Sequence, residues 1–241
     1  MARKPATSLR QILHRLGLDL IRYPAGTSWG APLQRVINET KPDLLIDVGA
    51  FEGAFSERCR ELGFGGRILS FEPASAAAEA LARRAGQDPR WTVRRLAIGD
   101  EAGEAELYVA ETPVLNSLLQ ASREGLEQYS SIATRGTERV EVARLDSVVA
   151  ELAPKARRIF LKIDAQGYDM RVLEGAAGIL DDLVAIHIEL SLQPFYEGST
   201  DYLNVLQWLR ERRFEPVDIV PGAVHGSFLA EADCLLQRRS G

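Results

Sequence analysis

Cysteine and long hydrophobic runs are both scarce in this 241-residue sequence. Its two cysteines, Cys59 and Cys234, do not make a disulfide framework, and we expect both to be buried, reduced thiols. No cysteines or histidines are spaced like zinc ligands, and no apolar stretch approaches the roughly 20 residues that cross a bilayer. These absences argue against a disulfide-rich secreted protein, a structural zinc protein and a protein with a transmembrane segment.

A surplus of basic charge is missing as well. The chain has 29 Lys and Arg residues against 34 Asp and Glu residues, which gives a formal net charge of -5. That balance disfavours a broad phosphate-binding surface, so we expect no nucleic-acid partner.

The N-terminal segment, residues 1–41, has the pattern of an amphipathic helix and not that of a signal peptide. Leu9, Ile12, Leu13 and Leu16 recur at helical spacing with polar residues between them, which predicts a cytoplasmic protein. We expect this helical segment to pack on the domain or on a second copy of the chain in a homodimer. Its arginines leave two alternatives, peripheral contact with a membrane surface and a lid over the active site.

The rest of the chain, residues 42–241, alternates strand-like and helix-like segments. This alternation predicts one α/β domain with a mostly parallel sheet and helices on both faces. Two segments, 103–109 and 138–145, instead alternate polar and apolar residues, as antiparallel strands do. The other expected strands are 44–48, 67–71, 91–98, 158–164, 184–190, 214–220 and 233–237, and the expected helices are 29–40, 52–62, 75–85, 168–180 and 202–213.

Carboxylates stand at the ends of three expected strands, namely Asp47, Glu72 and Asp164. Ligands of open α/β sheets bind beyond the carboxyl ends of the strands. Gly49 and Gly53 would let the chain turn tightly after the first strand and approach such a ligand. The alternative is a helix cap for Asp47 and a surface strand end for Glu72. Taken together, the three acids favour a nucleoside-shaped ligand.

The first turn also indicates which nucleoside binds. Its sequence, Gly-Ala-Phe-Glu-Gly over residues 49–53, lacks the G-x-G-x-x-G spacing of dinucleotide sites. The acid before its first glycine, Asp47, and the acid inside it, Glu52, would repel a pyrophosphate. S-adenosylmethionine carries two positive charges and no phosphate, and its ribose diol could donate two hydrogen bonds to Glu72. An NAD-dependent oxidoreductase and a non-catalytic scaffold with the same fold are the disfavoured alternatives.

Methyl transfer needs aligned reactants and a group that accepts the proton of the acceptor. Asp164, His187 and Glu189 stand near the ends of two neighbouring expected strands, and each is a candidate general base. A structural alternative pairs Lys162 with Glu189 or Asp164 and hydrogen-bonds His187 in the core. In a further variant, Asp164 and Glu189 hold Mg²⁺ that orients a sugar diol.

Six short motifs occur in a specific order: IDVGA at 46–50, GGRILSFEP at 65–73, AIGD at 97–100, NSLL at 116–119, LKIDAQGY at 161–168 and ELSL at 189–192. With them, the sequence resembles the FkbM family of S-adenosylmethionine-dependent methyltransferases. The resemblance implies a class I methyltransferase (Rossmann-like) three-layer sandwich, with a seven-stranded sheet whose last strand is antiparallel. It also implies O-methylation of a hydroxyl on a sugar, glycolipid or related natural product.

The resemblance further implies which residues contact the cofactor and the acceptor. Asp164 matches the position nearest the transferred methyl group and the small-molecule or glycan acceptor. The cofactor positions are Asp47 and Gly49 at the methionine end, with Ala50, Phe51 and Gly53 in the same turn, Glu72 and Pro73 at the ribose, and Ala97, Ile98 and Asp100 near the adenine.

Overall fold

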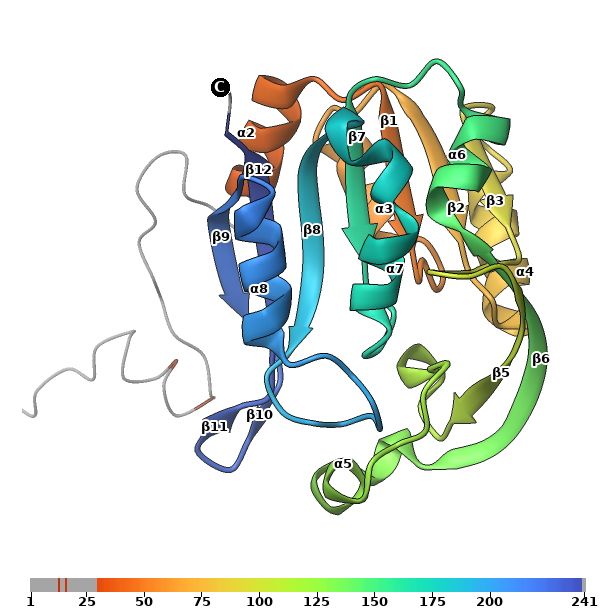
Figure 1. The fold of residues 1–241 in the computed structure, drawn as a ribbon, viewed down its shortest axis with the longest axis vertical. Helices are drawn as coiled ribbons and strands as arrows, with labels where there is room; N and C mark the ends of the chain where they lie inside the picture. Colours follow the sequence, from red (N-terminus) through yellow and green to blue (C-terminus); the bar gives the residue numbers. More distant parts are fainter. Residues whose placement is uncertain (1–12, 14–15, 17–29, 240–241) are drawn as a thin grey trace, which may run out of the picture.

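The structure is a computed structural model that describes residues 13, 16 and 30–239. Within this range, seven strands form one sheet in the order β3-β2-β1-β7-β8-β12-β9 (Figure 1). The strands pair in parallel, except that β12 runs antiparallel to both β8 and β9. This confirms the predicted sheet and its antiparallel last strand. The bounds are β1 Leu44–Val48, β2 Arg67–Phe71, β3 Trp91–Arg94, β7 Ile159–Ile163, β8 Leu183–Ser191, β9 Phe214–Pro221 and β12 Glu231–Arg238.

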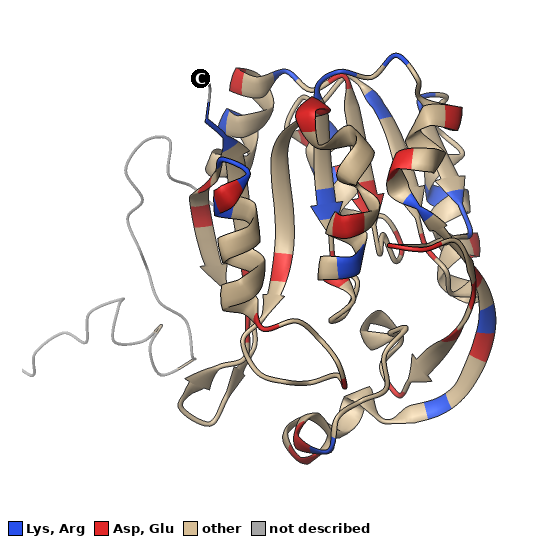
Figure 2. Ribbon diagram, viewed as in Figure 1, with Lys and Arg blue, Asp and Glu red and all other residues tan. Residues whose placement is uncertain are grey.

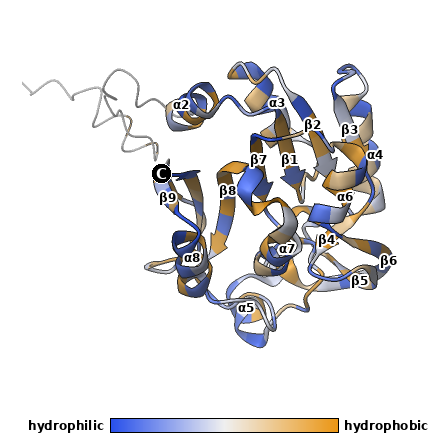
Figure 3. Ribbon diagram, turned by 45° about the horizontal axis from the view of Figure 1, so that its top comes forward, coloured by the Kyte–Doolittle hydropathy of each residue, from blue (hydrophilic) through white to orange (hydrophobic). Residues whose placement is uncertain are grey.

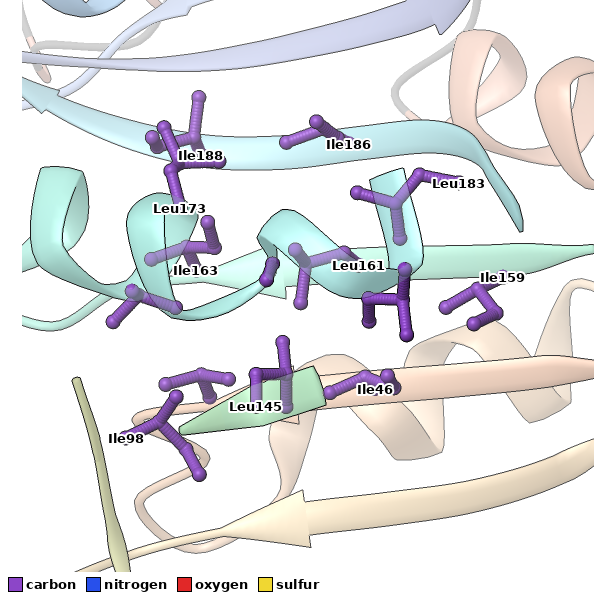
Figure 4. Packing of buried hydrophobic residues seen from close by; sticks show 14 of the residues in the cluster. Ile46, Ile98, Leu145, Ile159, Leu161, Ile163, Leu173, Leu183, Ile186 and Ile188 are labelled. Carbon is purple, nitrogen blue, oxygen red and sulfur yellow. The ribbon is translucent and has the colours of Figure 1, made fainter. Parts of the chain in front are cut away.

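Helices cover both faces of this sheet, as the strand–helix alternation predicts (Figure 3). Side chains alternate along β1, so Leu44 and Ile46 face one helix layer and Leu45 faces the other. Figure 4 shows the first core, where isoleucines of the parallel strands pack against Leu145 and Leu173. The helices α6 Leu145–Leu152, α7 Asp169–Gly175 and α8 Tyr202–Glu211 cover that face, and α2 Ala31–Thr40 and α3 Ala54–Glu61 cover the other, while α4 Ser75–Ala85 packs beside β3.

A second, three-stranded sheet of the described residues lies beyond the carboxyl ends of the parallel strands (Figure 1). It contains the antiparallel pair predicted at 103–109 and 138–145. The prediction of one strand over 91–98 was wrong, because the chain leaves the main sheet at the exposed Arg94 and Arg95 and enters the second sheet with buried residues. The strands are β4 Ala97–Gly99, β5 Gly103–Ala110 and β6 Thr134–Arg144, and η1 Pro113–Leu115, α5 Arg123–Gln128 and η2 Ser130–Ile132 connect β5 to β6.

Two further segments differ from the prediction. The helix predicted over 168–180 is split into α7 and the 3-10 helix η3 Ala177–Asp182. Gly175 lies at the break, where an added Cβ would come within 2.0 Å of the Gly99 carbonyl oxygen, so the chain has no room for a larger residue. A short hairpin, β10 Val224–His225 with β11 Phe228–Leu229, was not predicted.

The described part of the N-terminal segment is α2, which packs on the sheet through Val36 and Ile37. The helix predicted around Leu9 to Leu16 falls mostly on residues outside the described ones. Among the described residues, no helix is both long and apolar enough to cross a membrane.

Candidate active site

A cavity of about 590 Å³ opens where β1, β2 and β7 end. The chain runs outward from β1 to β2 and β3 and then returns to β7 on the other side of β1, so the cavity lies at the point where strand order reverses. Ligands of open α/β sheets bind at this place. Its lining residues are Val48, Gly49, Phe51, Phe71, Glu72, Pro73, Leu96, Ala97, Ile98, Leu107, Pro113, Val114, Asn116, Ser117, Leu118, Asp164, Ala165, Gln166 and Tyr168.

The turn after β1 forms one wall of the cavity. Gly49 has a φ of 65°, and an added Cβ would lie 1.8 Å from the Asp164 carbonyl oxygen, so only glycine fits there. The Gly49 and Ala50 N–H groups both donate to the Phe71 carbonyl, at 3.0 and 3.1 Å. The turn is therefore fixed against both neighbouring strands.

Glu72 follows β2 and faces the cavity with little solvent exposure. Its Oε2 accepts a hydrogen bond of 2.8 Å from the Phe51 N–H, and its Oε1 accepts one of 2.9 Å from the Ala74 N–H. Burial raises the pKa of Glu72 above its ordinary value, although the two backbone hydrogen bonds oppose this. Each carboxylate oxygen retains a free lone pair, so the group can accept further hydrogen bonds from a ligand.

The sequence predicts a cofactor contact for Asp47, but its side chain lies behind the turn and does not line the cavity. Asp47 lies two residues after Leu45 in β1, so both side chains are on the same face of the sheet. That face is covered by α3, and Asp47 is fully buried there. Its Oδ2 accepts a 2.6 Å hydrogen bond from the Ser56 hydroxyl, and its Oδ1 lies 3.2 Å from the Lys162 ammonium.

Three more predicted cofactor residues do not line the cavity. Ala50 is buried within the turn. Gly53 is the N-cap of α3, and an added Cβ there would contact Leu81 and Trp91. Asp100 forms an ion pair of 3.1 Å with Arg171. The other predicted cofactor residues do line it: Gly49, Phe51, Glu72, Pro73, Ala97, Ile98 and Asp164.

Lys162 is a buried cation inside β7, where Figure 2 shows charge in an otherwise uncharged strand. Its Nζ donates to the Gly49 carbonyl at 2.7 Å and lies 3.5 Å from Asp164 Oδ2. Burial opposes its charge, but Asp47 and Asp164 outweigh burial and raise the pKa of Lys162 above its ordinary value. The pairing of Lys162 with Asp164 is one of those expected in the structural alternative.

Gln166 holds Asp164 in place and was not among the predicted site residues. Its Nε2 donates to Asp164 Oδ1 at 2.8 Å and to Glu189 Oε2 at 2.9 Å, and its Oε1 lies 3.0 Å from the Tyr196 hydroxyl. Its φ of 49° is uncommon outside glycine and aims the amide back over the strand ends. The buried Ser117 hydroxyl donates to the Gln166 carbonyl at 2.7 Å, which ties the 113–118 wall to the same loop.

Burial favours the protonated form of Glu189. Burial, and then the negative charges of Asp164, Glu231, Asp169 and Asp233, raise the pKa of Glu189 to about 10. Glu189 lines a separate space of about 290 Å³ between α7 and α8, not the large cavity. It accepts a hydrogen bond from Gln166 outside the large cavity.

His187 lies away from both cavities, against α3. Its ring centroid is 4.8 Å from that of Phe55, and its Nε2 is 3.9 Å from Asp233. Burial and the nearby Lys162 lower the pKa of His187 to about 4, so the imidazole is neutral. Of the three predicted base candidates, the structure places only Asp164 in the large cavity.

A family model described as the methyltransferase FkbM domain matches residues 47–216, well over half of the chain. The chain belongs to the FkbM methyltransferase family. It is therefore an S-adenosylmethionine-dependent methyltransferase, which confirms the resemblance found in the sequence and displaces the NAD-dependent alternative. A search of curated proteins finds no match to the sequence.

Solved structures with a similar fold include several methyltransferases of low sequence identity. Ribosomal protein L11 methylase from Lactobacillus delbrueckii subsp. bulgaricus has 11% identity and a TM-score of 0.45, over 87% of this chain and 78% of that one. An rRNA methylase from Streptococcus thermophilus has 10% identity and a TM-score of 0.47, over 92% and 99%. TehB from Haemophilus influenzae has 10% identity and a TM-score of 0.46, over 85% and 62%.

The cavity of this FkbM methyltransferase suits the cofactor that the family implies. Glu72 offers two anchored acceptor oxygens, and Leu96, Ala97 and Ile98 form a buried apolar wall next to it. A ribose diol and an adenine ring need these two surfaces.

The described residues give no support to the variant in which Asp164 and Glu189 hold Mg²⁺. Within residues 30–239, no group of three or more His, Cys, Asp and Glu side chains is arranged to hold a metal ion. We therefore assign no step to a metal.

Proposed function

We propose that this FkbM methyltransferase transfers a methyl group to a hydroxyl of a sugar, glycolipid or related natural product. The observation that carries the proposal is the placement of Asp164. Its carboxylate lines the same cavity as Glu72, with one oxygen held by Gln166 and the other facing the Lys162 ammonium. A carboxylate held in this way beside a cofactor cavity is suited to accept a proton from an acceptor hydroxyl.

S-adenosylmethionine, when bound, supplies the methyl group as part of a sulfonium. In the proposed arrangement, Glu72 accepts hydrogen bonds from the ribose hydroxyls, with Pro73 beside it. The turn of Gly49 and Phe51 holds the methionine end. Ala97 and Ile98 form the adenine wall. Apart from Asp164, this arrangement uses every predicted cofactor residue that lines the cavity.

Asp164 is the proposed general base. In the transfer, the acceptor oxygen forms a bond to the methyl carbon as the carbon–sulfur bond breaks, and Asp164 takes the hydroxyl proton. Glu189 is less suited to this role because its raised pKa leaves it protonated, and His187 because it packs against α3. A positioned base typically contributes a factor of about 10² to 10⁴ in rate.

The test uses S-adenosylmethionine with an isotopically labelled methyl group and a fractionated glycan and lipid extract from cells that lack the protein. We expect label in one fraction, carried by a product one methylene heavier that resists mild alkali, as methyl ethers do. Label released as methanol by mild alkali would indicate a methyl ester, and label on nitrogen would indicate N-methylation. Either result would contradict O-methylation of a hydroxyl.

A further inference from the structure

Lys162 contacts two parts of the active site that come from different strands, namely the turn after β1 and the residue after β7. Its ammonium donates to the Gly49 carbonyl at 2.7 Å and lies 3.4 Å from the Val48 carbonyl, both at the end of β1. It also lies 3.2 Å from Asp47 and 3.5 Å from Asp164, the residue after β7. One buried cation therefore contacts the cofactor turn and the proposed base.

The two strand ends fit together closely at this point. The Asp164 N–H donates to the Val48 carbonyl at 3.2 Å, and Gly49 packs so tightly on the Asp164 carbonyl that a Cβ has no room. If the Gly49 carbonyl shifted, Asp164 would therefore have to move with it. Lys162 supplies the side-chain donor that holds this carbonyl in place.

A merely structural role would not need a charge at this position. Burying an ammonium costs several kcal/mol, and apolar residues of similar volume often replace buried ion pairs without loss of stability. The side chain of Lys162 is only 8% exposed, and both carboxylates face it. The sum of the formal charges of Asp47, Lys162 and Asp164 is one negative charge beside the cavity.

We propose that Lys162 is a positioning residue for methyl transfer, which holds the Gly49 turn and the Asp164 carboxylate in one fixed arrangement. The part that concerns Asp164 rests on the proposed function. The part that concerns the Gly49 turn requires only that the family's cofactor binds in the large cavity.

Two variants separate positioning from folding. Lys162→Met removes the ammonium and leaves the Asp47 and Asp164 carboxylates without the cation that they share. The double variant Asp47→Asn/Lys162→Met removes one carboxylate as well, and so it keeps the formal charge of the parent. Lys155→Met, on an exposed lysine, is the matched control. Thermal unfolding and calorimetric titration with S-adenosylhomocysteine are measured on all of them.

We expect Lys162→Met to unfold at a lower temperature and to bind S-adenosylhomocysteine at least tenfold more weakly. In the double variant, we expect most of the thermal stability to return while the affinity stays at least tenfold below that of the parent. The reason is that the buried charges are balanced again, but the Gly49 carbonyl and Asp164 still lack their donor. Lys155→Met is expected to match the parent in both measurements.

Parent-like affinity in the double variant would overturn the proposal, because stability alone would then explain the need for Lys162. Unchanged affinity in Lys162→Met would overturn it as well, and so would a double variant that fails to fold. Glu72→Gln in the same titration distinguishes a failure of the positioning role of Lys162 from a failure of the proposed cofactor placement. If Glu72→Gln weakens binding and the Lys162 variants do not, only the positioning role fails.

Discussion

Replacement of Glu189 by glutamine tests whether the Glu189 side chain is protonated in the folded protein. Burial and four nearby carboxyl groups raise the pKa of Glu189 to about 10. A glutamine has the shape and the neutrality of the protonated acid, and its amide oxygen can still accept the 2.9 Å hydrogen bond from Gln166. We therefore expect Glu189→Gln to stabilise the protein, and to do so more strongly as the pH rises.

The sign follows from the direction of the pKa shift. At a pH below the ordinary pKa of 4.5, Glu189 is protonated in both the folded and the unfolded chain, and its stabilising contribution is complete. As the pH rises toward the folded value of about 10, the unfolded chain loses this proton while the folded chain keeps it. Stability is then lost with rising pH, and the glutamine variant does not suffer this loss.

The magnitude follows from the same linkage. Each pH unit in this window lowers the free energy of unfolding by about 1.4 kcal/mol at most. Solvent reaches part of the group, so we expect about 1–3 kcal/mol between about pH 6 and about pH 8. For a chain of this size, that corresponds to roughly 2–6 °C in the unfolding midpoint.

The assay is thermal unfolding of the parent and of Glu189→Gln at several pH values across this window. Glu151→Gln, on an exposed glutamate, is the matched control and is expected to follow the parent at every pH. A Glu189→Gln variant that is less stable than the parent at the alkaline end would contradict the raised pKa of Glu189. A gap that narrows with rising pH would refute it as well.

Three further substitutions test the cavity. Glu72→Gln should weaken S-adenosylhomocysteine binding about tenfold or more in calorimetry, because one acceptor oxygen is lost, and parent-like affinity would remove Glu72 from the ribose site. Gly49→Ala should lower the unfolding midpoint and the cofactor affinity, because its Cβ would lie 1.8 Å from the Asp164 carbonyl, and a normally stable, tightly binding variant would contradict that packing. Asp164→Asn should keep cofactor affinity but lose about 10² to 10⁴ in transfer rate, whereas an unchanged rate would assign the base elsewhere.

The main sheet could be predicted from the sequence because its strands are continuous apolar runs separated by amphipathic helices. Because these runs are continuously apolar, the sequence does not show toward which face of the sheet the Asp47 side chain points. All five residues of β1 are buried between two helix layers, so no polar face reveals which way a side chain points. Glu72 comes after the last residue of β2 and faces the cavity, whereas Asp47 lies one residue inside β1 and faces α3.

Gln166 could not be predicted for a different reason. Its contacts depend on a backbone with positive φ and on Glu189 and Tyr196, which come from distant parts of the chain. The glycine that follows it in the motif was the one local sign of an unusual turn. Likewise, the pKa of Glu189 depends on carboxyl groups from other parts of the chain, and the sequence pattern does not show how close they lie.

The most direct test of this active site is a crystal structure of the protein with S-adenosylhomocysteine bound. We expect the ribose hydroxyls on the Glu72 carboxylate, the adenine against Ala97 and Ile98, and the sulfur turned toward Asp164. A ligand bound outside this cavity, or one whose ribose makes no contact with Glu72, would contradict this placement.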